Sequence, residues 1–177
     1  MPAALLSPIL AVPDIEWVSL QVGPTSHEIG TRYGIPDVSA RLTDFDQTAA
    51  LIATLDIVIA VDTATAHLAG AMGKPVWLLL PYAPDWRWLR RSEDPSQDVS
   101  PWYASAKLFR QPEPGNWLAV VAAVADALRA RYPVRVSSDT PNVASVADTP
   151  LTTVPQIKST TATSAENPLI VAKLVMS

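Results

Sequence analysis

The chain has 177 residues, a formal net charge of −4 at pH 7 and no cysteine. The length fits one ordinary domain rather than two large ones. The negative charge excludes the basic surface that a nucleic-acid backbone requires. The lack of cysteine excludes disulfides, thiol nucleophiles and thiolate metal sites. The only two histidines, His27 and His67, cannot form a multi-histidine zinc site, so we expect neither a metal nor a nucleic-acid partner.

Both ends of the chain are apolar, but neither predicts a targeting or membrane segment. Residues 1–13, MPAALLSPILAVP, contain three prolines and no Lys or Arg, which favours a truncated element or a short amphipathic helix over a signal peptide. The C-terminal NPLIVAKLVMS falls short of the roughly 20 residues that span a bilayer. We therefore expect a cytoplasmic protein with no membrane span.

The first part of the chain alternates weak strand and loop signals. Residues 16–21, EWVSLQ, predict a strand that stops at Gly23-Pro24. Residues 25–34 predict a loop with weak helical character, and residues 35–40, IPDVSA, predict a second short strand. A helix through residues 47–55 follows, with Asp44 or Asp46 as its cap.

The next part shows clear α/β alternation. Residues 57–61, IVIAV, form a continuous apolar run typical of a strand buried on both faces of a parallel sheet. The remaining predicted elements are a helix from Ala64 to Gly73, a strand at 76–80, an aromatic and proline-rich loop at 81–106, a short strand at 107–111 and a helix at 116–132 capped by Asn116. This order predicts an α/β fold with a Rossmann-like parallel sheet over residues 14–132.

The character of the sequence changes at Pro133. Residues 137–166 contain five Ser, seven Thr and three Pro, and no periodicity survives. Residues 133–177 are therefore predicted to be a disordered Ser/Thr/Pro-rich tail.

The turn after the buried strand carries the first functional signal. Ligands of doubly wound sheets bind where strands end and helices begin, and the first turn of a helix offers unpaired N–H groups to an anion. Thr63 and Ala64 are small enough for a phosphate or diphosphate to approach. Asp62 suits hydrogen bonds from sugar hydroxyls, and His67 lies one turn further on the same side. An alternative stays open, in which Thr63 merely caps the helix and His67 is an ordinary packed side chain.

The loop after the next strand carries the second signal. PDWRW places Asp85, Trp86, Arg87 and Trp88 near the same edge. Arginine offers a forked donor for a diphosphate, and tryptophan a flat surface for a base or sugar ring. The alternative is that the loop buries its tryptophans as a lid, and we expect Trp102 and Tyr103 to do such packing.

Two stretches of the chain resemble a known family. DFDQTAALIATLDIVIAVDTATAHLAGAMGKPVWLLLPYAPDWRWL and SPWYASAKLFRQPEPGNWLAVVAAVADAL are similar to the C-terminal, donor-binding half of family 9-like glycosyltransferases. These relatives of the heptosyltransferases often follow tetratricopeptide repeats. The resemblance spans about residues 14–131 and implies the C-terminal half of a glycosyltransferase B fold. It further implies that the domain binds a nucleotide-sugar as substrate, with no cofactor, and transfers a glycosyl group to an acceptor hydroxyl.

The resemblance also implies donor-binding residues. Asp62, Thr63 and His67 match the D-[ST]-x-x-x-H turn that contacts the donor diphosphate and sugar in heptosyltransferases, and Ala64 stands where many of them have glycine. The complete implied set is Asp62, Thr63, Ala64, His67, Asp85, Trp86 and Arg87.

The departures from the family pattern leave the activity of this chain open. Family members take the acceptor and the general base largely from an N-terminal domain, so we expect an incomplete fragment with a missing N-terminal half and assign no catalytic residue. The acceptor would be a glycan, a lipopolysaccharide core or a protein. The alternative is an inactive remnant or interaction module that keeps the α/β scaffold. A nucleotide binder of another kind is disfavoured because the sequence has no glycine-rich phosphate loop.

Overall fold

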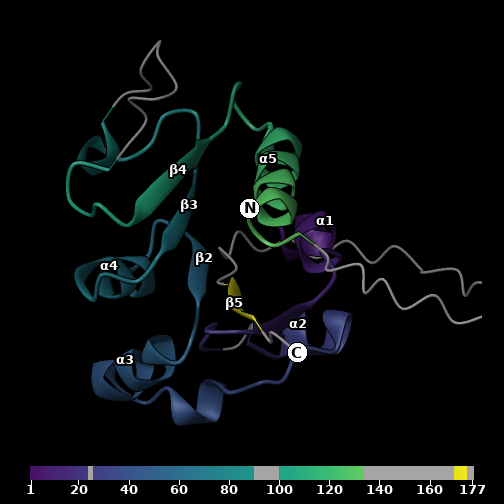
Figure 1. The fold of residues 1–177 in the computed structure, drawn as a ribbon, viewed down its shortest axis with the longest axis vertical. Helices are drawn as coiled ribbons and strands as arrows, with labels where there is room; N and C mark the ends of the chain where they lie inside the picture. Colours follow the sequence, from purple (N-terminus) through teal and green to yellow (C-terminus); the bar gives the residue numbers. More distant parts are fainter. Residues whose placement is uncertain (24–25, 90–99, 134–169, 175–177) are drawn as a thin grey trace, which may run out of the picture.

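The computed structural model describes residues 1–23, 26–89, 100–133 and 170–174 (Figure 1). Its helices are α1 (Ser7–Leu10), α2 (Ser26–Tyr33), α3 (Phe45–Ala53), α4 (Ala64–Ala71) and α5 (Trp117–Arg131). Short 3-10 turns are η1 (Ala3–Leu6), η2 (Ser39–Arg41) and η3 (Trp86–Trp88). The strands are β1 (Ile15–Val18), β2 (Ile57–Val61), β3 (Val76–Leu80), β4 (Ala106–Arg110) and β5 (Ile170–Leu174).

The strands form one sheet in the order β1-β5-β2-β3-β4. Strands β2, β3 and β4 are parallel neighbours, with Val58 opposite Val76 and Leu78 opposite Leu108. The predicted parallel α/β sheet is therefore confirmed. Its carboxyl edge gathers the ends of β2, β3 and β4, and this is where the candidate site lies.

Strand β5 is an addition to the predicted fold. It pairs antiparallel with β1 on one side and with β2 on the other, although the sequence analysis expected no element after residue 132. The sequence IVAKL begins with two β-branched residues, but such a short apolar run inside a low-complexity segment does not distinguish a strand. The rest of the predicted tail, residues 134–169 and 175–177, lies outside the described residues.

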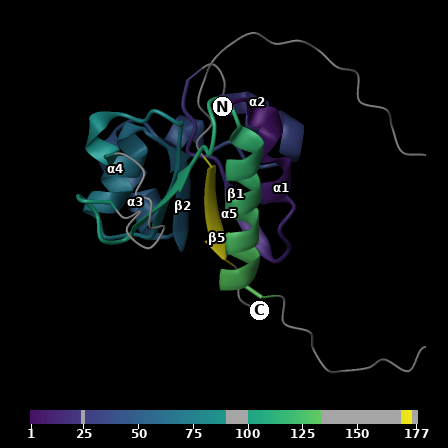
Figure 2. The same cartoon turned by 90° about the horizontal axis from the view of Figure 1, so that it is seen from above.

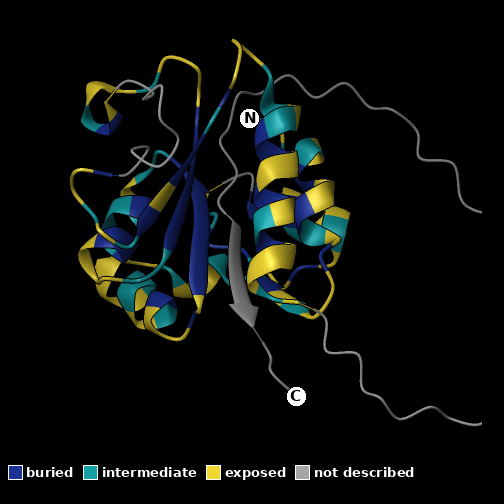
Figure 3. Ribbon diagram, turned by 45° about the horizontal axis from the view of Figure 1, so that its top comes forward, coloured by how far each residue is buried: buried dark blue, intermediate teal, exposed yellow. Residues whose placement is uncertain are grey.

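The sheet is the middle of three layers. Helices α3 and α4 cover one face, and α1, α2 and α5 cover the other (Figure 2). All five residues of β2 and all five of β3 are buried. Figure 3 shows these strands as a buried centre and the outer sides of the helices as the exposed surface. A domain with a core on both faces of its sheet can hold a rigid carboxyl edge.

Local side-chain chemistry sets several helix ends as predicted. Asp44, rather than Asp46, caps α3, because its Oδ1 accepts the Gln47 N–H at 2.8 Å. Asn116 caps α5 through its Oδ1, which accepts the Ala119 N–H at 3.2 Å. Helix α4 ends at Ala71, and the left-handed Gly73, with φ of 72°, follows two residues later.

The N-terminal third departs from the predictions in two places. Residues 35–40 do not form a strand: only Asp37 makes a bridge, an isolated one to Ser19, which follows the end of β1. The Asp37 carboxylate accepts the Ser39 N–H at 2.9 Å, and such a side-chain turn competes with strand pairing. The segment predicted as a loop with weak helical character at 25–34 contains helix α2, which ends at Tyr33 and is followed by the left-handed Gly34, with φ of 68°.

The start of the chain belongs to the same core as the sheet. The predicted short amphipathic helix is present as η1 and α1, which bury Leu6 and Ile9 in the cluster that includes Val121 and Leu128 of α5. Among the described residues, no helix has the length and hydropathy needed to cross a membrane.

The buried centre gives a stability prediction. Replacing Leu78 with alanine should lower the free energy of unfolding by about 2–5 kcal/mol, because the side chain is fully buried and its removal leaves a cavity. Urea unfolding measures this change. The same substitution at Leu118, which is 64% exposed on α5, should change the free energy by less than about 0.5 kcal/mol. Equal losses at the two sites would contradict the assigned core.

Candidate functional site

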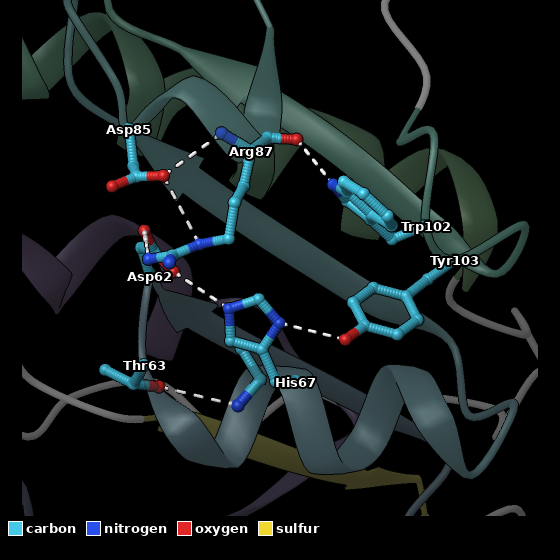
Figure 4. Close-up of polar contacts among 8 residues, drawn as sticks. Asp62, Thr63, His67, Asp85, Arg87, Trp102 and Tyr103 are labelled. Carbon is cyan, nitrogen blue, oxygen red and sulfur yellow. Dashed lines mark hydrogen bonds and ion pairs between the residues drawn. The ribbon is translucent and has the colours of Figure 1, made fainter.

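The site begins where β2 ends and α4 begins. Asp62 follows the last residue of β2, and Thr63 is the cap residue of α4, in extended conformation. The Thr63 hydroxyl accepts the Ala66 N–H at 3.4 Å, and the Thr63 carbonyl accepts the His67 N–H at 3.2 Å (Figure 4). The predicted cap is therefore present. It leaves the first-turn amides of Ala64 and Thr65 directed outward, as at any helix start.

Arg87 reaches the same turn from the loop after β3. Its Nη2 lies 3.9 Å from Asp62 Oδ2, and its Nε lies 3.3 Å from Asp85 Oδ1. The Asp85 Oδ1 also accepts the Arg87 backbone N–H at 3.0 Å, which caps η3. One guanidinium thus lies between two carboxylates from different segments of the chain. These groups are partly exposed, so each ion pair contributes little to stability.

The backbone of this loop is fixed by two more side chains. The Trp102 indole N–H donates to the Arg87 carbonyl at 2.7 Å. The Arg110 guanidinium donates to the carbonyls of Trp88 and Leu89. Leu89 adopts a φ of 58°, which non-glycine residues rarely do. These contacts hold Arg87 beside α4.

His67 has partners on both sides of its ring. Its Nε2 lies 3.3 Å from Asp62 Oδ1, and its Nδ1 lies 2.9 Å from the Tyr103 hydroxyl. The ring stacks on Trp88 with a centroid distance of 5.2 Å and an interplanar angle of 22°. His67 is therefore packed against Trp88, as one interpretation of the sequence expected, and its Nε2 also faces Asp62 at the turn.

Residues of both segments line an open hollow of about 490 Å³. Its lining consists of Asp62, Thr63, Ala64, His67 and Arg87. These are five of the seven residues named from the sequence, and they come from two separate segments. Of the other two, Asp85 does not line the hollow but forms an ion pair with the Arg87 guanidinium. Trp86 is 71% exposed and meets Trp102 edge to face, with a centroid distance of 6.5 Å.

For the aromatic loop, the structure decides between the two interpretations of Trp88, corrects the expectation for Trp102 and adds a contact to the expected packing of Tyr103. Trp88 does not lie at the mouth: it is fully buried, in the core cluster that contains Leu78 and Leu108. Trp102, expected to pack, is 56% exposed. Tyr103, expected only to pack, also contributes its hydroxyl to His67. Apart from the cluster of aromatics before β4, no local pattern predicts these contacts, because they join residues that are far apart in the chain.

The site shows no grouping typical of a metal centre. Within the part of the chain that the structure describes, no three His, Asp or Glu side chains lie close enough together to hold an ion.

Comparison with known proteins finds a similar family and one similar protein. Residues 36–84 match the family model described as glycosyltransferase family 9 (heptosyltransferase), and this segment includes the turn from β2 into α4. This part of the chain is therefore similar to family 9 glycosyltransferases, in agreement with the resemblance seen in its sequence. It is also 34% identical over 135 residues to Protein FlbA of Caulobacter vibrioides (strain ATCC 19089 / CIP 103742 / CB 15). That alignment covers 72% of this chain but only 22% of FlbA, so the chain spans a small part of its relative. No solved structure matches the chain.

The cap residue gives the second prediction. Replacing Thr63 with alanine removes the acceptor for the Ala66 N–H and should lower the free energy of unfolding by about 1 kcal/mol. Serine at the same position keeps the hydroxyl and should retain most of this stability. Urea unfolding of the two variants separates a capping role from loss of the methyl group. If serine costs as much as alanine, the hydroxyl does not cap the helix.

Proposed function

We propose that the hollow at the start of α4 binds the diphosphate and sugar of a nucleotide-sugar donor, and that the domain serves glycosyl transfer to an acceptor hydroxyl. The observation that carries this proposal is the meeting of Asp62, Thr63, Ala64, His67 and Arg87 in one open hollow at the carboxyl edge of the parallel sheet. Such edges are where α/β sheets bind ligands.

The proposed position of the diphosphate follows from the helix start. Thr63 uses its hydroxyl on the Ala66 N–H, so the amides of Ala64 and Thr65 are the ones offered to a ligand. The helix dipole adds a partial positive charge at this end, and the small side chain of Ala64 lets an oxygen approach the backbone. These features together favour an anion with two or more oxygens.

Arg87 adds a full positive charge to the partial positive charge of the helix start. A guanidinium can donate two parallel hydrogen bonds to a phosphate. In the free protein it lies between Asp62 and Asp85, at ion-pair distances of 3.9 and 3.3 Å. Because exposed ion pairs of this kind contribute about 0–1 kcal/mol, a diphosphate can replace one carboxylate at small cost.

Asp62 has a different proposed role. A carboxylate repels phosphate, but it accepts hydrogen bonds from the hydroxyls of a sugar attached to that phosphate. Its oxygens lie near His67 on one side and Arg87 on the other, which fixes their direction. Asp62 would thus orient the sugar while the helix start holds the diphosphate.

In the transfer step, an acceptor hydroxyl would attack the anomeric carbon while the bond to the diphosphate breaks. Negative charge then grows on the departing diphosphate, next to the amides of α4 and Arg87, which stabilise it. The acceptor and the general base are not assigned to residues of this chain. We place the reaction in the cytoplasm, because a chain without cysteine suits a reducing compartment.

A second candidate is a domain that keeps this architecture without turnover. The observation in its favour is the presence of two carboxylates around the Arg87 guanidinium, which reduces the positive charge available to a diphosphate. Binding measurements separate the two candidates, because a domain that keeps only the architecture is not expected to bind a nucleotide-sugar.

The proposal predicts stabilisation by a donor. Among UDP-, ADP-, GDP- and CMP-linked sugars, at least one should raise the melting temperature of the full chain. A ligand at about a hundred times its Kd adds about 2.7 kcal/mol to the free energy of unfolding. The double variant Asp62→Asn, Thr63→Ala should lose this stabilisation. Asp126→Asn, on the exposed side of α5, is the matched control and should keep it. If the double variant is stabilised as much as the wild type, the hollow is not the donor site.

A further inference from the structure

Three side chains form a relay that ends at the hollow. The Tyr103 hydroxyl lies 2.9 Å from His67 Nδ1, and His67 Nε2 lies 3.3 Å from Asp62 Oδ1 (Figure 4). Tyr103 lies outside the lining of the hollow and comes from the segment before β4. Its hydroxyl therefore acts on the site through His67.

The partners of the ring determine where its proton is. An ionised carboxylate only accepts hydrogen bonds, whereas a tyrosine hydroxyl both donates and accepts. A neutral His67 with its proton on Nδ1 would point the lone pair of Nε2 at the Asp62 carboxylate, which is unfavourable. With the proton on Nε2, the Nε2–H faces Asp62 and Nδ1 accepts from Tyr103.

Gly70 makes room for this tyrosine. It lies one turn after His67 on α4, and a Cβ atom at this position would lie 2.6 Å from Cγ of Tyr103 and 2.8 Å from Cδ2. Real Cβ contacts are never this short, so any larger residue at position 70 must displace the Tyr103 ring. Trp88, stacked on the His67 ring and fully buried, limits where that imidazole can turn.

We infer that Tyr103, seated against Gly70, is a positioning residue that fixes His67 as the Nε2–H tautomer and directs this proton toward the mouth of the hollow. Because the Nε2–H faces Asp62 Oδ1 in the free protein, an oxygen of a bound ligand would share this proton with that carboxylate. The functional value of this donor rests on the proposed donor binding, but the tautomer is a property of the free protein.

The wild-type protein tests the inference directly. Long-range ¹H–¹⁵N correlation of the full chain, labelled at histidine and measured at about pH 9, well above the ordinary pKa of an imidazole, reports which ring nitrogen carries the proton. The chain has only two histidines, so a His67→Gln variant assigns the signals and His27 serves as an internal reference. We expect the proton on Nε2 of His67. A proton on Nδ1 would overturn the inference.

Two substitutions test the role of Tyr103. Tyr103→Phe removes the hydroxyl, and Gly70→Ala keeps the hydroxyl but displaces the ring. Both should shift the Nδ1 resonance of His67 away from its hydrogen-bonded position and reduce the excess of the Nε2–H form. The matched control is Tyr33→Phe, which removes a hydroxyl that donates to the Ala3 carbonyl at 2.9 Å on the opposite face of the sheet. It should leave the His67 signals unchanged.

Each outcome of these experiments either supports or overturns the role of Tyr103. If Tyr103→Phe folds and its His67 nitrogen shifts equal those of the wild type, Tyr103 does not position the ring. If that variant does not fold, Gly70→Ala and the wild-type tautomer still decide the question. Where a nucleotide-sugar binds the wild type, Tyr103→Phe should weaken its Kd about 5-fold, the value of one ordinary hydrogen bond, and Tyr33→Phe should not. Failure of every nucleotide-sugar to bind would instead refute the proposed function and leave the tautomer result standing.

Discussion

The parallel pairing of β2 and β3, buried on both faces, is the constraint on which the rest of the structure depends. Each strand contributes five buried residues, and full burial of an aliphatic side chain stabilises a fold by about 1.5–3 kcal/mol. Because both faces of this pair are buried, a shift of β2 along β3 would disturb the packing on both sides. The place at which β2 ends is therefore fixed. Asp62 and Thr63 occupy that place, and the cap at Thr63 turns the chain directly into α4. The geometry of the hollow is thus a consequence of the core.

The loop after β3 contributes the side chains that distinguish this turn from an ordinary capped helix start. A capped helix start is common and does not by itself indicate a ligand. Here Trp88 fills the core beside β3, and this burial places its neighbour Arg87 over the helix start. Trp102 and Arg110 then hold the loop backbone. The same tryptophan stacks on His67, so one buried side chain orients both a cation and an imidazole around the hollow.

Much of this arrangement could be predicted from the sequence, and the physical reasons are clear at particular residues. The apolar runs IVIAV and VWLLL gave β2 and β3 with the observed bounds, because burial on both faces leaves an unmistakable pattern. The cap residues Asp44 and Asn116 were also predictable, since capping depends on local chemistry. Residues 35–40 were mispredicted as a strand because Asp37 makes a side-chain turn that strand propensity does not include. The Tyr103–His67 contact joins residues 36 positions apart, and β5 pairs with a strand more than a hundred residues earlier. No local pattern encodes such contacts.

The central claim is that the amides at the start of α4 and the Arg87 guanidinium bind a diphosphate. Backbone and guanidinium ¹H–¹⁵N spectra, recorded while UDP, ADP or GDP is added to the full chain, test it most directly. The account predicts that at least one of them shifts the amide signals of Ala64 and Thr65 together with the Arg87 side-chain signal, in proportion to occupancy. Saturable shifts that map to another surface, or no shifts with any of the three at millimolar concentration, would contradict it.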